Sequence, residues 1–215
     1  MNILQRLLKR IPLCPFPYKP YMHKYKCIFI HIPKNAGSSI MQLLGDKGGR
    51  FHVESNYYKQ ANYYFYKKYH SFAFTREPLE RLFSAYKYAS KGGNQREDDI
   101  NLAAYINTRC SDFNGFIDNV LTLHFIMQQP LFKPQYLFVY TNNLQLNVDT
   151  LIKLEELDRV WPDFSIQQGL PSQLAHINQT NKQAMPVLTT TQYNKITALY
   201  KYDYILLKYP LTYGC

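Results

Sequence analysis

The sequence predicts an α/β fold, in which helices flank a mainly parallel central sheet to form a three-layer sandwich. Two short and strongly apolar segments, residues 26–32 and 71–75, have the length and composition of buried strands. Each is followed by a loop and then by apolar residues at helical spacing. Strands that alternate with helices in this way are typical of a parallel sheet covered by helices.

In the first half of the chain, each predicted strand leads into a helix. The first strand is followed by a loop and a helix over 39–44, which Gly45 ends. A tyrosine-rich segment then predicts a helix over 56–67. After the second strand, Pro78 suits the first turn of a helix whose apolar stripe includes Leu82.

In the second half, the same patterns predict further helices and two more strands. A final segment, 204–207, continues the closing helix or forms an edge strand. The predicted elements are, in order, a loop over 91–99, helices over 100–107 and 113–127, strands over 135–140 and 150–153, and a helix over 191–202.

The chain has 215 residues, of which 46% are hydrophobic, and this suits one domain with a sizeable core. We expect an N-terminal extension over 1–25 and a single domain over 26–215. Basic residues interrupt the leucines near the N-terminus, so we expect no signal peptide there. That segment forms a capping helix on the core or a weak peripheral membrane contact. No run of about 18 apolar residues predicts a transmembrane helix.

Charge and cysteine content restrict the partners and the compartment. The 25 basic and 15 acidic residues give a net charge of +10, which attracts nucleic acid, anionic membranes, nucleotides or acidic polysaccharides. The four cysteines show no metal-ligand spacing. We interpret them as reduced thiols of a cytoplasmic protein, and we expect no metal site.

The first loop, residues 33–39, is equipped to hold a phosphate-like anion. A strand that enters a tight loop and a helix start directs several backbone N–H groups, and the positive end of the helix dipole, to one point. Gly37 permits a close approach, Lys34 adds a cation, and Ser38 and Ser39 add hydroxyl donors. The Walker pattern is absent, because here the lysine precedes a single glycine. The alternative is an ordinary turn with a serine N-cap.

The second motif, residues 75–84, places Arg76 at a strand end just before a helix. A guanidinium suits a phosphate monoester, and Ser84 lies on the polar side of the same helix. Arg81 is expected to be solvated on that side. Alternatively, Arg76 forms a surface ion pair with Glu77 or Glu80, and Ser84 is solvated.

Together, HIPKNAGSS and FTREPLERLFSAY resemble the two cofactor-binding motifs of the carbohydrate sulfotransferases, in the heparan sulfate 2-O and 6-O branch with its short bacterial members. Later segments extend the resemblance over most of the chain from Cys27 onward. It implies a P-loop-like fold and PAPS (3′-phosphoadenosine 5′-phosphosulfate) as co-substrate. The first motif would bind the 5′-phosphosulfate, and the Arg and Ser of the second would bind the 3′-phosphate. The matching positions are Lys34, Gly37, Ser38, Ser39, Arg76 and Ser84. Asn35 and Ala36 of the first loop are also assigned to the cofactor, although Asn35 stands where Thr is commoner in the family and Ser38-Ser39 replaces a Thr-Ser pair.

Sulfuryl transfer to a hydroxyl needs charge stabilisation on the leaving phosphate and a general base. Lys34 suits the first task. Histidine suits the second near neutral pH, and the chain has six. His31 is expected to make a structural hydrogen bond beside the first loop. In the family that the motifs resemble, the base is a histidine between the two motifs, which implies His52, with Glu54 as the fallback. The alternative is that His52 is a surface residue.

The acceptor is the least defined part of the expected function. The resemblance implies a carbohydrate hydroxyl, and the net charge is compatible with an acidic polysaccharide. A late loop, with His176, Asn178, Thr180 and Lys182, closes over the cofactor, borders the acceptor cleft, or is an ordinary polar loop. Tyrosines within 62–69 stack on sugar rings or fill the core.

Two other functions compete with sulfate transfer. A small P-loop-like kinase would use similar phosphate loops, but it would need Mg²⁺ and carboxylates to hold it, and no acidic cluster is evident. A nucleic-acid-binding protein would explain the basic charge, but no nucleic-acid-binding motif is recognisable, so nucleic acid is not an expected partner. Sulfuryl transfer from PAPS to a carbohydrate is therefore the predicted activity.

Overall fold

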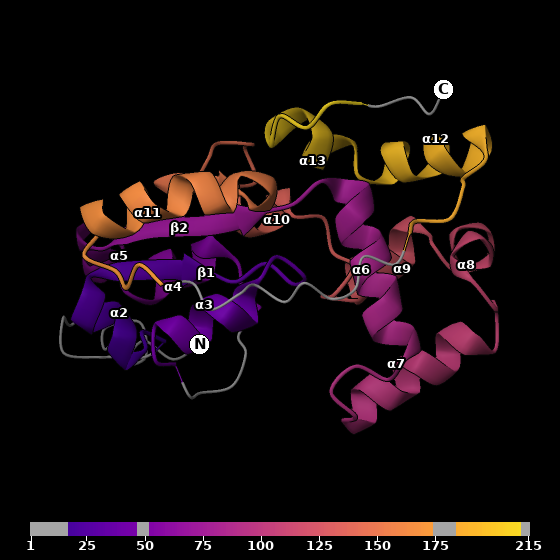
Figure 1. The fold of residues 1–215 in the computed structure, drawn as a ribbon, viewed down its shortest axis with the longest axis horizontal. Helices are drawn as coiled ribbons and strands as arrows, with labels where there is room; N and C mark the ends of the chain where they lie inside the picture. Colours follow the sequence, from indigo (N-terminus) through magenta and orange to yellow (C-terminus); the bar gives the residue numbers. More distant parts are fainter. Residues whose placement is uncertain (1–16, 47–51, 174–183, 212–215) are drawn as a thin grey trace. The chain divides into compact units, whose positions relative to one another are not determined.

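A computed structural model describes residues 17–46, 52–173 and 184–211 of the chain. The chain divides into two compact units. The first is built from residues 1–75 and 137–179, and the second from residues 76–136 and 180–215. Figure 1 labels helices and strands of both units where there is room.

The first unit contains a parallel sheet of three strands, β1 (Cys27–Ile30), β2 (His70–Thr75) and β3 (Thr150–Lys153), in the order β1-β2-β3. β1 pairs with β2, with Ile30 opposite Ala73, and β2 pairs with β3, with Thr75 opposite Lys153. Because all the strands run in the same direction, their carboxyl ends meet at one edge of the sheet. The first loop follows β1 at that edge, and Thr75 ends β2 there.

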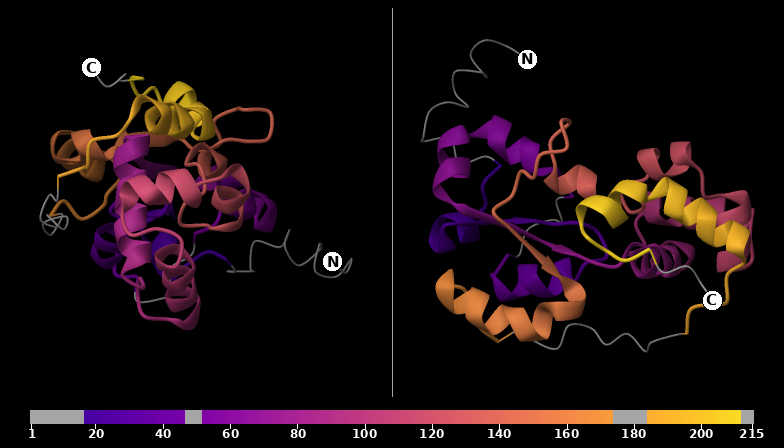
Figure 2. Two further views of the ribbon diagram at one scale, coloured as in Figure 1. Left: turned by 90° about the vertical axis from the view of Figure 1, so that its right-hand side faces the viewer. Right: turned by 90° about the horizontal axis from the view of Figure 1, so that it is seen from above.

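Helices cover both faces of this sheet. Every residue of β1 is buried, as are all those of β2 after His70, which is typical of strands covered on both faces. Figure 2, in its right-hand view, shows α11 on one side of the sheet and α4 and α5 on the other. The helices of this unit are α2 (Pro20–Tyr25), α3 (Gly37–Leu43), α4 (Ser55–Ala61), α5 (Tyr63–Lys68), the 3₁₀ helix η1 (Leu154–Glu156) and α11 (Leu157–Gln167).

Aromatic side chains form much of the core between the sheet and α11. Phe72 and Phe74 of β2 are fully buried and lie beside the buried Trp161 of α11, with ring centroids 6.4 and 5.9 Å apart from the indole. Phe29 of β1 packs on Phe72 at 5.2 Å. This packing explains why the strand segments are continuous apolar runs rather than alternating ones.

The second unit consists of helices around a second aromatic core. Phe83 of α6 packs on Phe113 of α8 with ring centroids 4.9 Å apart, and Phe116 packs on Phe132 at 5.3 Å. The helices assigned to this unit are α6 (Pro78–Ser90), α7 (Glu97–Asn107), α8 (Phe113–Asn119), α9 (Leu123–Gln128), α12 (Thr190–Leu199) and α13 (Lys201–Leu206). A one-turn helix, α10 (Tyr136–Val139), begins at the last residue of segment 76–136.

The predicted α/β fold with a parallel sheet flanked by helices is confirmed. The strands expected over 26–32, 71–75 and 150–153 correspond to β1, β2 and β3. The helices expected over 39–44 and from Pro78 correspond to α3 and α6. Among the described residues, no helix has the length and apolar character needed to cross a membrane.

The strand predicted over 135–140 is wrong, because this segment contains the helical turn α10. The Asp203 carboxylate accepts hydrogen bonds from the backbone N–H groups of Gln135 and Tyr136, at 2.9 and 2.8 Å. A carboxylate that accepts successive amides favours the start of a helix. Only Tyr140, which bridges to Leu146, has an isolated strand-like pairing within the predicted segment.

Polar or turn residues divide three of the predicted helices. Asn62 separates α4 from α5, because it is extended and its side chain caps α5 by accepting from Phe65 N at 3.1 Å. Thr122 caps α9 in the same way and separates it from α8. The closing helix is interrupted at Tyr200, which separates α12 from α13, and residues 204–206 belong to α13 instead of forming a strand. The predicted loop over 91–99 gives way to α7 at Glu97, and α2 and α11 were not predicted.

Candidate active site

The first loop has an unusual backbone, because two residues that are not glycine adopt the left-handed conformation. Lys34 has φ 69° and Ala36 has φ 56°, while Asn35 between them does not have a positive φ. Backbone of alternating sign makes a concave nest whose N–H groups converge on an anion. Each such residue costs about 1 kcal/mol, a strain that is concentrated at ligand sites. Ala36, and not a serine, is the N-cap of α3.

Asn35 attaches the first loop to the sheet. Its side chain is buried, and its Nδ2 donates to the carbonyl oxygen of Phe74 at 2.7 Å. Phe74 lies in β2, so this hydrogen bond joins the loop after one strand to the neighbouring strand. The amide therefore fixes the loop rather than facing outward as a donor. Ser38 is exposed and Lys34 and Ser39 are half-buried, so their side chains lie at the protein surface.

Gly37 is required because the ring of His31 occupies the space that a side chain would need. A Cβ placed on Gly37 would lie 1.8 Å from Nε2 of His31. His31 is 5% exposed and its ring stacks on Phe29 at 5.8 Å. The sequence predicts a conformational role for Gly37, and the structure adds a steric one: only glycine lets the loop lie against this ring.

His52 lies beside His31. Its Nδ1 donates to the carbonyl oxygen of His31 at 3.2 Å, and the two rings are 4.3 Å apart. A neutral imidazole with its proton on Nδ1 carries its lone pair on Nε2, which is the form that a general base needs. His52 is half-buried, and Glu54 follows two residues later as the N-cap of α4. The described first unit thus brings His52 to the first loop through His31.

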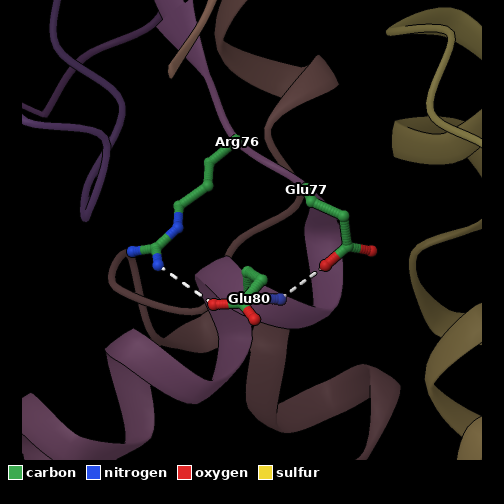
Figure 3. Close-up of polar contacts among 3 residues, drawn as sticks. All are labelled: Arg76, Glu77 and Glu80. Carbon is green, nitrogen blue, oxygen red and sulfur yellow. Dashed lines mark hydrogen bonds and ion pairs between the residues drawn. The ribbon is translucent and has the colours of Figure 1, made fainter. Parts of the chain in front are cut away.

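Arg76 belongs to the second unit, and its guanidinium is paired. Figure 3 shows the side chain extending along the start of α6 to Glu80, whose Oε2 is 3.1 Å from Nη2. The ion pair predicted as the alternative role of Arg76 is therefore present, with Glu80 rather than Glu77. Glu77 instead caps α6 by accepting from Glu80 N, and it accepts from Tyr204 Oη at 3.1 Å. Burial raises the pKa of the Glu77 carboxyl.

Ser84 and Lys87 lie on the same side of α6 as Glu80. Ser84 is one helical turn beyond Glu80, it is half-buried, and Leu82 and Phe83 beside it are buried. Burial lowers the pKa of Lys87, and the positive charge of Arg76 adds to that effect. Lys87 is thus a cation near Arg76 that the sequence analysis did not single out. Its position three residues after Ser84 was the available signal.

The backbone of Arg76 is held by the side chain of Gln135. Oε1 of Gln135 accepts from the Arg76 N–H at 3.0 Å, and Nε2 donates to the Arg76 carbonyl oxygen at 2.7 Å. We call this pair of hydrogen bonds the Gln135 clamp. Gln135 is fully buried, and Asp203 holds its backbone N–H. The sequence analysis assigned neither residue a role, although each is a polar residue within an aromatic segment.

Arg81 was predicted to be solvated, and this prediction is wrong. It is 1% exposed, and its Nη2 donates to the carbonyl oxygens of Leu131 and Lys133 at 3.2 and 2.9 Å. Burial raises the pKa of the Asp203 carboxyl to about 6, and the positive charge of Arg81 acts against that increase. A buried guanidinium needs carbonyl and carboxylate partners, which the segment before α10 and helix α13 supply.

Some predicted residues lie outside the described parts of the chain. These are residues 1–16 of the N-terminal extension and the late-loop residues His176, Asn178, Thr180 and Lys182. Within residues 17–46, 52–173 and 184–211, no group of three or more His, Cys, Asp or Glu side chains is arranged to hold a metal ion. The described parts supply a loop with two left-handed residues beside a histidine in the first unit, and an arginine and a serine along one helix in the second.

Comparison with known proteins gives one match. A family model described as the sulfotransferase family matches residues 21–210, which is most of the chain and includes both motifs. No match was found among curated proteins or among solved structures.

Proposed function

Because this chain belongs to the sulfotransferase family, we propose that it transfers the sulfuryl group of PAPS to a hydroxyl of a carbohydrate acceptor. Family membership makes the chain a sulfotransferase, and sulfotransferases of this family normally use PAPS. The choice of donor, of acceptor and of the heparan sulfate 2-O and 6-O branch rests on the two motifs. The kinase and nucleic-acid alternatives gain no support from the family match.

The contact of His52 with His31 is the observation that carries the proposal. In the sequence, helix α3 separates His52 from the first loop. In the structure, His31 connects them, because its ring lies against Gly37 and its carbonyl oxygen accepts from His52. A general base must lie within hydrogen-bond reach of the hydroxyl that it deprotonates, and that hydroxyl attacks the sulfur held at the first loop. This arrangement supports His52 as the base and the first loop as the phosphosulfate site.

Lys34 and the loop backbone are assigned to the 5′-phosphosulfate. The left-handed Lys34 and Ala36 shape a concave backbone that suits an anion. The Lys34 ammonium would stabilise charge that develops on the leaving phosphate, and the hydroxyls of Ser38 and Ser39 would orient it. Asn35 has a supporting role, because its side chain holds the loop on Phe74.

Arg76 and Ser84 are assigned to the 3′-phosphate. The guanidinium has five N–H donors in a planar fork, and the Glu80 pair uses part of that fork. This ion pair is half-exposed, so it is worth at most about 1 kcal/mol and a phosphate can displace or share it. The hydroxyl of Ser84, one turn beyond Glu80, would donate to the same phosphate.

In the proposed reaction, the donor supplies an activated sulfur whose bond to the phosphate oxygen breaks as the acceptor oxygen bonds to sulfur. Nε2 of His52 accepts the acceptor proton, while Nδ1–H stays on the His31 carbonyl. Lys34 pairs with the phosphate oxygen that is released. The products are the sulfated acceptor and adenosine 3′,5′-bisphosphate.

A carbohydrate acceptor is supported by the surface of α5. Tyr63 and Tyr64 are 58% and 51% exposed, and the ammonium groups of Lys67 and Lys68 lie 5.9 and 5.5 Å from their ring centroids. Exposed aromatic faces suit sugar rings, and lysines suit sulfate or carboxylate groups. Tyr66, in the same segment, is buried and fills the core. In this proposal, the exposed Tyr63 and Tyr64 take the other role that the sequence left open, stacking on sugar rings.

A cytoplasmic location is part of the proposal. Cys27 and Cys110, the cysteines within the described residues, are free thiols rather than a disulfide. Reduced cysteines are typical of a cytoplasm.

The test incubates the full chain with PAPS and a panel of capsular, O-antigen and glycosaminoglycan acceptors, and detects sulfated product by mass spectrometry. With the best acceptor, we expect His52→Ala to lower kcat by about 100-fold or more, the contribution of a general base, and to leave the affinity for adenosine 3′,5′-bisphosphate within about twofold. The matched control is His124→Ala, because His124 is exposed on α9. Unchanged kcat in His52→Ala would remove His52 from the mechanism.

A further inference from the structure

We infer that Gln135 is the positioning residue that orients Arg76 toward the 3′-phosphate of the nucleotide. The inference rests on the proposed use of PAPS, and it adds a residue from outside both motifs. Gln135 lies 59 positions after Arg76 in the sequence. Its importance is visible only in the structure, where its side chain contacts the Arg76 backbone at two points.

The Gln135 clamp fixes both polar groups of the Arg76 backbone. The side-chain amide of Gln135 accepts from Arg76 N–H at 3.0 Å and donates to Arg76 C=O at 2.7 Å, as a neighbouring strand would. Arg76 is the first residue after β2 and the second before α6, so no regular element holds it. The Gln135 side chain therefore hydrogen-bonds the first residue after β2 in the way that a neighbouring strand bonds the residues within β2.

The clamp is itself rigid, because Gln135 is held from behind. Gln135 is 0% exposed, and the Asp203 carboxylate accepts from Gln135 N–H and from Tyr136 N–H. Asp203 is also 0% exposed, and the neighbouring Tyr204 donates to Glu77, the residue after Arg76. Helix α13 thus holds both Gln135, which binds the Arg76 backbone, and Glu77, the next residue in the chain.

This support matters because the Arg76 side chain has little else to direct it. Arg76 is half-buried, and its guanidinium pairs with the half-exposed Glu80. Surface ion pairs of this kind hold a long side chain weakly. A fixed backbone limits where the guanidinium can reach, and a misplacement of about 1 Å is enough to lose much of a charge-assisted hydrogen bond.

The test compares how well variants distinguish adenosine 3′,5′-bisphosphate from adenosine 5′-monophosphate, measured by isothermal titration calorimetry. The ratio of the two dissociation constants reports the 3′-phosphate interaction alone. We expect the wild type to prefer the bisphosphate by about 100-fold, and Arg76→Ala to lose most of that preference. Gln135→Met, which keeps the side-chain volume but removes both hydrogen bonds, should lower the ratio about tenfold and leave monophosphate affinity within about twofold.

Gln192→Met is the matched control, since it removes a buried glutamine from the same unit. Gln192 is 4% exposed, and its Nε2 donates to Asp118 Oδ2 at 2.8 Å on α8. Its side chain belongs to the capping box of α12, where Oε1 accepts from Thr189 N–H at 3.0 Å. We expect this variant to lose stability like Gln135→Met but to keep the wild-type ratio, so a general loss of stability is separated from the positioning effect.

The outcomes separate the inference from the function on which it rests. A wild type that does not prefer the bisphosphate overturns the proposed donor and the inference with it. A wild-type preference that Gln135→Met retains overturns the inference alone. If Gln135→Met does not fold, hydrogen exchange of the wild type without nucleotide tests the clamp instead. Protection of the Arg76 amide supports the clamp, and rapid exchange of that amide contradicts it.

Discussion

The ring of His31 occupies the space beside Gly37 that a side chain at that position would need. The sequence does not reveal this contact, because His31 follows the last residue of β1 and Gly37 is the first residue of α3. The ring fills the site of a Cβ at 1.8 Å, and the carbonyl of the same residue holds His52. One histidine therefore links the shape of the loop to the position of the proposed base.

Gly37→Ala should disturb both features. The added methyl group must displace the buried His31 ring, and we expect a loss of about 1 to 3 kcal/mol in the free energy of unfolding and a fall in kcat of at least about tenfold. Chemical denaturation and steady-state kinetics measure these effects.

Gly169→Ala is the control for Gly37→Ala, because Gly169 has φ +63° and nothing lies within 4 Å of the added Cβ. It should cost about 1 kcal/mol from backbone strain and leave kcat unchanged. Full activity in Gly37→Ala would show that catalysis does not depend on the observed position of the His31 ring.

The Arg76–Glu80 ion pair gives a second prediction for a single residue. Glu80→Gln removes the charge that competes with a phosphate for the guanidinium, while the backbone N–H of residue 80 still donates to Glu77. We expect the affinity for adenosine 3′,5′-bisphosphate to rise by roughly two- to fivefold, the range that a surface ion pair represents. A weaker affinity in this variant would mean that Glu80 helps to hold the arginine for the ligand.

At the scale of elements, the sequence identified strands and motif loops better than helix boundaries. β1 and β2 are continuous apolar segments buried on both faces, so their pattern depends on local sequence alone. The interruptions at Asn62 and Thr122 depend on a side chain capping the next helix, which periodicity does not detect. The turn α10 depends on Asp203, which is remote in sequence, and so could not be predicted from its own residues.

The same limit applies to the candidate site. Lys34, Gly37, Arg76 and Ser84 were identified from two short motifs. Gln135 and Asp203 were not identified, because their contacts join residues that are distant in sequence. Gln135 is 59 residues from Arg76, and Asp203 is 68 residues from Gln135. Burial of Arg81 was also missed, since a charged residue on a helix is usually exposed.

The buried network of α13 predicts a pH dependence of stability. Burial raises the folded-state pKa of Asp203 to about 6, above the usual value of 3.8. Between these values the folded protein binds more protons at this site than the unfolded chain does, so this contribution to stability falls as pH rises through the window. We expect the free energy of unfolding of the wild type, relative to Asp203→Asn, to decrease by roughly 2 kcal/mol from pH 4 to pH 6.

Denaturation of both proteins across this pH range measures the difference. Asp203→Asn removes the titrating carboxylate, while its remaining oxygen still accepts one of the two amides. The comparison of the two proteins cancels groups that titrate in both. A difference that stays constant or increases from pH 4 to pH 6 would contradict the assigned pKa shift.

At the scale of the whole molecule, the net charge of +10 attracts acidic partners over a distance set by the salt concentration. We expect KM for an acidic polysaccharide to rise severalfold between about 50 and about 300 mM salt at saturating PAPS, and KM for a neutral polysaccharide to stay within about twofold. Initial rates with the two acceptors measure this. Equal salt effects on both would show that the charge does not select the acceptor.

The transfer reaction itself tests the central claim most directly. The full chain is incubated with PAPS and a responsive glycan, and the sulfated glycan and adenosine 3′,5′-bisphosphate are quantified together by mass spectrometry. We predict that the wild type forms both products in equal amounts. We also predict that the Lys34→Ala and Arg76→Ala variants stay folded but form neither product at a significant rate. Release of the bisphosphate without sulfated glycan across the panel, or full transfer by either variant, would contradict the proposed function.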